Sequence, residues 1–177
     1  HVAHGVVWFG LAEYDALRVD WLMRQYNSCK RSAYQAIHRV GLKGNNVRNY
    51  CKRNYAHIGQ RYLNDAVSEA QKIQHDHVIF GSKKLWKKLQ KGEITKEQWN
   101  QERNKSLYSR GDRTKKGNPN LRIVGDELWI NDPCERGKWI KGKLWLHKRP
   151  DLRCYDVRVI KNGNEYKVVV SWEALPM

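Results

Sequence analysis

The hydrophobic periodicity of this chain changes once along its length, and that change constrains the fold more than any other feature. Up to about residue 107, apolar residues recur at helical spacing, whereas from Leu121 onward they alternate with polar residues as in half-buried strands. One earlier run, residues 2–11, is also apolar and β-branched enough for a short strand. This order predicts an α+β fold whose first strand is separated from the others by helices.

Two amphipathic helices are expected in the first half of the chain. The first covers about residues 15–40, and its apolar face carries Leu22, Tyr26, Cys29, Ala33, Ile37 and Val40. Gly41 to Gly44 ends it, and a second helix is expected over about residues 46–74. Because the connecting loop is short, these helices are expected to pack as an antiparallel pair.

Two shorter helices and a loop follow. Residues 83–90 form a basic amphipathic stretch that Gly92 ends. Thr95 and Gln98 have the spacing of a capping box, which predicts a further helix to about Leu107. Residues 109–120 combine turn-forming residues with cations and have almost no apolar content, so they are expected to be a long loop.

The C-terminal third is expected to supply about five strands. Residues 121–124 and 127–131 read as a hairpin, residues 139–147 as a strand, and residues 155–160 and 165–172 flank the hairpin signal Asn162-Gly163. With the first strand they predict a small antiparallel β-barrel of the oligonucleotide-binding type with an inserted α-helical domain. The expected divisions are residues 1–12 for the first barrel strand, 13–108 for the helical insertion, and 109–177 for the basic loop and remaining strands.

Positive charge is concentrated in one segment. The 177-residue chain has a net charge of +16, and residues 81–122 contain thirteen Lys and Arg against four acidic residues, a net of +9. A polyanion is the natural partner of such a segment, because neutralised phosphates release condensed counterions without regard to base sequence. The alternative is a solvated face that only keeps the protein soluble.

Aromatic residues lie beside several of these cations. The chain has eight Trp and nine Tyr but only two Phe, and Trp and Tyr suit base stacking as well as ordinary core packing. The candidate nucleic-acid contacts are Lys83, Lys84, Lys87 and Lys88 on the short helix, Arg110, Arg113, Lys115 and Lys116 in the loop, and Lys138, Trp139 and Lys141 at a barrel strand.

Other functional classes find little support. No run of eighteen apolar residues exists, so no membrane partner is expected, and the four cysteines form no Cys-x-x-Cys pair, which argues against a zinc ribbon or disulfide scaffold. Asp65 and Glu69 lie one helical turn apart, but such a pair is common on solvated helices. We therefore expect no catalytic residues, no metal ligands, no cofactor and no small-molecule substrate in this chain.

The segment from Phe80 to Asn131 carries a more specific signal. It contains Phe80-Gly-Ser-Lys-Lys84, Gly92 to Trp99, Arg103-Asn104, Leu107 to Asp112, Lys115-Lys-Gly-Asn118, Asn120-Leu-Arg122 and Leu128-Trp-Ile-Asn131. This run resembles the amino-terminal half of the TnpB (IS605 OrfB) family of transposon-encoded, RNA-guided nucleases, which are akin to compact Cas12 effectors. The resemblance implies a wedge barrel with an inserted recognition domain and adds Arg103 and Arg122 to the candidate contacts.

The resemblance also implies the partners, guide RNA and target DNA, and a cytoplasmic setting in a prokaryote or virus. It leaves out the nuclease: the first catalytic aspartate of the RuvC domain and the zinc-binding cysteines are not found here, so Mg²⁺ would belong to an absent domain. The chain is therefore expected to be the binding part of a longer protein. A different reading is a free-standing helix-turn-helix DNA-binding protein that uses residues 15–40 and 46–74, with Asn45 to Arg53 facing a groove.

Overall fold

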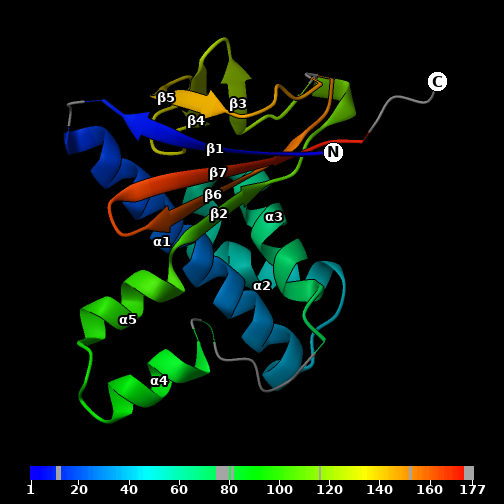
Figure 1. Cartoon of the computed structure of the whole chain (residues 1–177). Coiled ribbons are helices and arrows are strands. Elements are labelled where there is room, and N and C mark those ends of the chain that lie inside the picture. The colour runs from blue at the N-terminus through cyan, green and yellow to red at the C-terminus, as the bar shows by residue number, and fades with distance from the viewer. Residues whose placement is uncertain (11–12, 75–79, 81, 116, 152, 174–177) are drawn as a thin grey trace.

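The computed structural model describes residues 1–10, 13–74, 80, 82–115, 117–151 and 153–173 and has an α+β fold (Figure 1). Seven strands lie within these residues: β1 (Val2–Phe9), β2 (Ser106–Ser109), β3 (Leu121–Val124), β4 (Glu127–Asn131), β5 (Trp139–Leu146), β6 (Asp156–Asn162) and β7 (Glu165–Ser171). The α-helices are α1 (Glu13–Gln35), α2 (Asn45–Tyr55), α3 (Gln60–Gln71), α4 (Lys83–Gln90) and α5 (Lys96–Arg103), with short segments η1 (Ala36–Val40), η2 (Ala56–Ile58) and η3 (Arg113–Lys115) of other helical types.

All seven strands belong to one antiparallel sheet in the order β2-β6-β7-β1-β5-β4-β3. The first strand lies at its centre, because β1 pairs with β7 on one side and with β5 on the other. The sheet curls into a half-barrel whose edge strands β2 and β3 do not pair with each other (Figure 1). The expected antiparallel β unit is thus an open, curled sheet rather than a closed barrel.

Both predicted hairpins are confirmed. Val124 pairs with Glu127 around a turn in which Gly125 has φ +59°, and Asn162 pairs with Glu165 around a turn in which Gly163 has φ +64°. Glycine adopts this left-handed conformation at little steric cost, and the resulting turns match the twist of the strands they join. These local signals fix the register of both hairpins.

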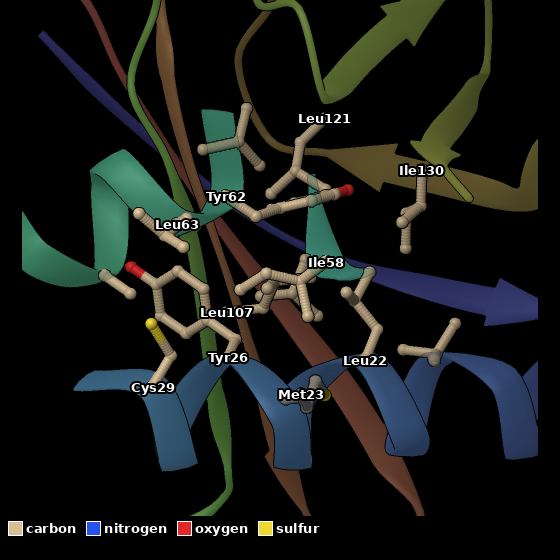
Figure 2. Close-up of a cluster of buried hydrophobic side chains, with 14 of the residues drawn as sticks. Leu22, Met23, Tyr26, Cys29, Ile58, Tyr62, Leu63, Leu107, Leu121 and Ile130 are labelled. Atoms are coloured by element: carbon tan, nitrogen blue, oxygen red, sulfur yellow. The ribbon is translucent and has the colours of Figure 1, made fainter. Parts of the chain in front are cut away.

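One hydrophobic core joins the sheet to α1 and α3. Figure 2 shows Leu22 and Tyr26 of α1 beneath Tyr62 of α3, with Leu121 and Ile130 of the sheet close by. All five side chains are almost completely buried. Burial of each large apolar side chain contributes roughly 1.5–3 kcal/mol, so this contact contributes substantially to the stability of the fold.

The predicted apolar face of the first helix is largely confirmed. Leu22, Tyr26, Cys29 and Ala33 are buried, whereas Val40 is 58% exposed. The helix changes to a π-type segment at Ala36 and ends at Gly41, where φ is +82°. The last turn is therefore rotated away from the phase of the preceding helix, and Val40 leaves the core.

Two of the expected helices are wrong in extent. The single helix expected over residues 46–74 is two helices, because Gly59 has φ +85° and ψ 152°, which no helix accommodates. As a result α1 packs against both α2 and α3 instead of one long partner. The helix expected to reach Leu107 ends at Arg103, since Leu107 pairs with Val159 in the sheet and is fully buried.

The two short helices begin where the sequence predicts. Ser82 Oγ accepts a hydrogen bond from the Leu85 N–H at 3.0 Å, and the capping box of Thr95 and Gln98 is present at the start of α5. The Trp86 and Trp99 rings, 5.4 Å apart, pack α4 against α5. In Figure 1 this pair lies at the lower left, away from β3, β4 and β5.

The expected division at residue 108 falls inside strand β2, and the domain boundaries themselves stay a prediction. No helix among the described residues is both long and apolar enough to cross a membrane.

Candidate nucleic-acid interface

The solvent-facing side of β1, β3, β4 and β5 carries tryptophans and cations. Glu127 lies among them, because it pairs with Lys143 in the sheet and accepts a hydrogen bond from Trp129 Nε1 at 3.4 Å. Strand register places Trp129 between Arg122 and Lys141, and it places Lys143 opposite Trp8. Directly paired residues point to the same side of a sheet, and the intervening residues of these strands face the core. We call the following set the Trp–cation face: Trp8, Arg122, Trp129, Trp139, Lys141, Lys143 and Trp145.

Close contacts order the middle of this face. Lys141 Nζ lies 4.1 Å from the centroid of the Trp129 ring, and the Arg122 guanidinium carbon lies 5.0 Å from that of Trp139. The two indole rings are 6.1 Å apart and tilted by 49°. Cation–π attraction of about 0.5–1 kcal/mol per exposed pair favours these positions of the cations over the ring faces. The rings and cations are therefore neighbours in the structure without a ligand.

The outer part of the face is more exposed. Trp8 and Trp145 have 55% and 57% of their surface exposed, which is unusual for tryptophan. Lys143 forms an exposed ion pair with Asp126 at 3.1 Å, and the Lys143 ammonium lowers the pKa of that carboxyl. Such an exposed pair is weak enough for a phosphate to compete for the lysine.

Only part of this face was predicted from the sequence. Arg122, Trp139 and Lys141 were expected as contacts and lie together in the structure, whereas Trp8, Trp129, Lys143 and Trp145 were not expected. The signal was available, because the strand Trp139-Ile-Lys-Gly-Lys-Leu-Trp145 alternates polar or aromatic residues with core residues. Lys138 precedes this strand and forms an ion pair with Glu135.

The lysines of α4 form a second, separate basic surface. Lys83, Lys84 and Lys87 are exposed and Lys88 is half-buried. Trp86, 37% exposed, lies on the same helix. Since α4 and the Trp–cation face are distant from each other in Figure 1, the predicted contacts do not form one continuous patch.

Arg103, a predicted nucleic-acid contact, interacts with neighbouring residues of the fold. Its guanidinium carbon is 5.8 Å from the Trp99 centroid, and its carbonyl oxygen accepts a hydrogen bond from Arg31 at 3.3 Å. Burial, together with the charge of Arg103, lowers the pKa of Arg31 to about 10. Arg31 also donates to Asn104 Oδ1 at 2.9 Å, so these residues fasten the end of α5 to α1.

The basic loop after β2 is anchored by a buried asparagine. Asn118 Oδ1 accepts hydrogen bonds from Ser109 Oγ at 2.8 Å and from the Leu121 N–H at 2.9 Å, while its amide donates to the carbonyl oxygens of Ser109 and Tyr155. Asn118 is fully buried. The loop is therefore held at both ends despite its lack of apolar residues.

Two of the loop cations, Arg110 and Arg113, line a cavity of about 1100 Å³. Arg113 is paired with Glu173 at 2.9 Å. Lys115 lies in the short turn η3, and the predicted contact Lys116 lies outside the described residues.

The carboxylates considered as a metal site are engaged elsewhere. Glu69 accepts a hydrogen bond from the Tyr26 hydroxyl at 2.5 Å and forms ion pairs with Arg158 and Lys30. Burial raises the pKa of Asp65 to about 7, and the charges of Glu69 and Asp156 add to this. Among the described residues no group of three or more His, Cys, Asp or Glu is placed to hold a metal ion.

Cys29 and Cys51 are buried neighbours. The Cys51 sulfur lies 4.0 Å from the Cys29 carbonyl oxygen, and both are free thiols. A hydrogen bond that the Cys29 thiol donates to the Cys51 sulfur, together with burial, raises the pKa of Cys29. They contribute to the α1–α2 contact as small apolar residues.

The family described as SSO2105 N-terminal domain matches residues 7–177 of this chain. A comparison with curated proteins found no match. The matched region begins within β1 and includes all five α-helices and the other six strands of the described residues. The half-barrel and the helices that cover it thus form a single family unit, and the chain belongs to the SSO2105 N-terminal domain family.

Proposed function

We propose that this chain is the nucleic-acid-binding lobe of a TnpB-like, RNA-guided DNA endonuclease and that it binds guide RNA and target DNA. The observation that carries the proposal is the Trp–cation face. Ring faces stack on bases of any identity, and cations beside them neutralise phosphates, so the combination suits a strand that is recognised by backbone and shape.

The exposure of this face supports a binding role over a purely structural one. Trp8 and Trp145 together leave a large aromatic area in contact with water, and exposed aromatic patches rimmed by polar residues are typical of interaction surfaces. The cations around the rings select for a negatively charged partner. A protein partner of strongly acidic composition would satisfy the charge but not the stacking geometry.

The topology is compatible with the wedge and recognition parts that the resemblance implies. Helices α1 to α5 all lie in sequence between β1 and β2, although β1 is the central strand of the sheet. In this proposal they are the recognition domain, and the lysines of α4 form a second contact with RNA or DNA. DNA cleavage and its Mg²⁺ belong to a nuclease domain outside this chain.

A helix-turn-helix-type DNA-binding protein is the second candidate, because the surface of α2 is polar and basic. Asn49, Lys52 and Arg53 are exposed on this helix. Arg48 is half-buried, and its Nε atom has no hydrogen-bond partner among the described residues. A helix with this composition can read bases in a major groove.

Competition between two folded nucleic acids separates the candidates. A folded RNA hairpin and a B-form DNA duplex of equal length and charge compete with a labelled RNA at one salt concentration. Binding through A-form shape and stacking favours the hairpin, because only RNA presents a shallow groove lined by 2′-hydroxyls. The same measurement is made with Trp139→Ala and Arg48→Ala.

If the chain is the proposed lobe, we expect it to bind the RNA hairpin more tightly than the duplex and to lose affinity for the hairpin when Trp139 is replaced by alanine. A preference for duplex DNA of particular sequence, with loss through Arg48→Ala alone, contradicts the proposal and supports the helix-turn-helix protein. In that case individual base pairs are expected to contribute about 1–3 kcal/mol each.

A further inference from the structure

The cavity of about 1100 Å³ lies apart from the Trp–cation face and has an unusual lining. Its walls come from the N-terminus, α3, the basic loop, Asp151, residues 153–156 and the end of β7. Four arginines line it: Arg61, Arg110, Arg113 and Arg153. Small-ligand sites usually measure about 300–1,000 Å³, so the space is sufficient for a nucleotide.

The carboxylates of this cavity are engaged by donors. Asp156 accepts from the Tyr108 hydroxyl at 3.0 Å and from the Gly111 N–H at 2.7 Å, Asp151 accepts from the Arg153 N–H at 3.0 Å, and Glu173 is paired with Arg113. Asp112 accepts from the Thr114 hydroxyl and N–H. Glu173 is thus paired with a cation, whereas Asp112, Asp151 and Asp156 accept hydrogen bonds from neutral donors and keep their negative charge.

Three of the guanidiniums lack such partners. Within the described part of the chain, the side chains of Arg61, Arg110 and Arg153 have neither an ion pair nor a hydrogen bond. Asn64 also lines the cavity, and its Oδ1 atom is buried without a hydrogen-bond partner among the described residues. An unpaired buried acceptor carries a free-energy cost that a ligand donor removes.

We propose that this cavity binds a nucleoside monophosphate, with Arg61, Arg110 and Arg153 on the phosphate and Asn64 on a hydroxyl or amino donor of the nucleoside. A phosphate monoester carries nearly two charges and three acceptor oxygens at neutral pH, which matches three guanidiniums. This inference rests on the proposed function: the ligand of the cavity is the phosphorylated terminal nucleotide of the bound strand. A free mononucleotide has the same chemistry, and the experiment distinguishes the two sources.

Asp65 makes this binding depend on pH. Its carboxyl lines the cavity next to Arg110, whose N–H lies 3.4 Å from it, and its pKa is raised by burial to about 7. Glu69, Asp156, Tyr26, Tyr62 and Tyr108 are the other titratable groups that interact with it from α3, β6, α1 and β2. Ionised Asp65 repels the phosphate, so affinity is expected to rise as pH falls from about 8 to about 6.5.

Binding of labelled oligouridylates tests the proposal. Three strands of one length are compared, with a 5′-phosphate, a 3′-phosphate or hydroxyl groups at both ends, and adenosine 5′-monophosphate is tested alone. One phosphorylated strand is expected to bind at least about tenfold more tightly than the hydroxyl strand.

Arg61→Glu with Arg153→Glu should remove this preference, whereas Arg24→Glu with Arg39→Glu, an equal charge change on exposed arginines of α1 and η1, should keep it. Asp65→Asn should abolish the rise in affinity at low pH and leave only the decrease that protonation of the phosphate, with a second pKa of about 6, causes.

The outcomes separate this inference from the proposed function. If all three strands bind equally, or if the preference survives the Arg61 and Arg153 changes, the cavity assignment is wrong while strand binding by the Trp–cation face stands. If adenosine 5′-monophosphate binds and no strand does, the cavity assignment stands with the free nucleotide as its ligand, and the proposed function fails. Binding of neither strand nor mononucleotide overturns both.

Discussion

At the scale of single residues, Trp139 combines stacking surface with a fixed cation beside it. Its replacement by alanine should reduce affinity for single-stranded RNA by about 1–3 kcal/mol, the usual loss when one stacked base is released. The measurement is an equilibrium titration, with circular dichroism to confirm that the variant is folded. Tyr50→Ala, which removes an aromatic ring 37% exposed on α2, is the matched control. Equal losses in both variants would contradict a specific role for the face.

Asp65 makes the stability of the fold depend on pH. Its pKa is about 7 in the folded protein and about 3.8 in the unfolded chain. Between these pH values the carboxyl is therefore mostly protonated in the folded state and mostly ionised in the unfolded state. The carboxyl therefore destabilises the fold increasingly as pH rises from about 4 to 7, by about 2 kcal/mol at pH 8 after allowance for its partial exposure.

Asp65→Asn should accordingly raise the free energy of unfolding at pH 8 and have little effect near pH 4. Urea denaturation at both pH values measures this difference, and Glu93→Gln removes an exposed carboxylate as a control. A variant as unstable as the wild type at pH 8 would show that burial does not penalise the Asp65 charge.

The sequence predicts some residues of the candidate face but not their neighbours. Trp139 and Lys141 were predicted as contacts because cations lie close to an aromatic residue in the sequence, and Arg122 was added by the family resemblance. The structure places all three on one face. Trp8 joins them only through the pairing of β1 with β5, which connects residues far apart in the chain. No local pattern specifies which strands become neighbours in a sheet.

At the scale of elements, Gly59 separates two helices that a continuous apolar pattern had joined. Its φ of +85° and ψ of 152° lie in a region that only glycine adopts readily. Gly59→Ala should lower the free energy of unfolding by roughly 1–3 kcal/mol. Gly10→Ala, at a position with open space and ordinary φ, should change it by less than about 0.5 kcal/mol. Equal effects in denaturant titrations would mean that the break between α2 and α3 does not depend on this glycine.

The elements that the sequence predicted correctly are those with a local cause. The β3–β4 and β6–β7 turns and the α5 capping box are each set by a few adjacent residues, and all three were confirmed. Strand β2 was missed because Leu107 follows a helical pattern without a break. Its pairing with Val159 and its burial in the core decide its conformation, and both are tertiary effects.

At the scale of the whole molecule, positive charge is divided among the Trp–cation face, α4 and the basic loop. The sequence showed one basic segment, residues 81–122, and the fold separates its α4 lysines from Arg122. Arg122 lies on the Trp–cation face with Lys141 and Lys143, which come from outside the segment. If the loop contacts phosphates, Lys115→Glu with Lys116→Glu should flatten the slope of log K against log salt by roughly 1.5–2 units. Titrations at several salt concentrations measure this slope. A folded double variant with an unchanged slope would mean that the loop is only solvated.

Ultraviolet crosslinking locates the bound strand on the whole molecule and tests the central claim most directly. Single-stranded RNA containing 4-thiouridine is crosslinked to the chain, and the modified peptides are mapped by mass spectrometry. Binding to the Trp–cation face predicts crosslinks within β4 and β5, at residues 127–131 and 139–146. Crosslinks confined to α2, at residues 45–55, with none on these strands would contradict the account.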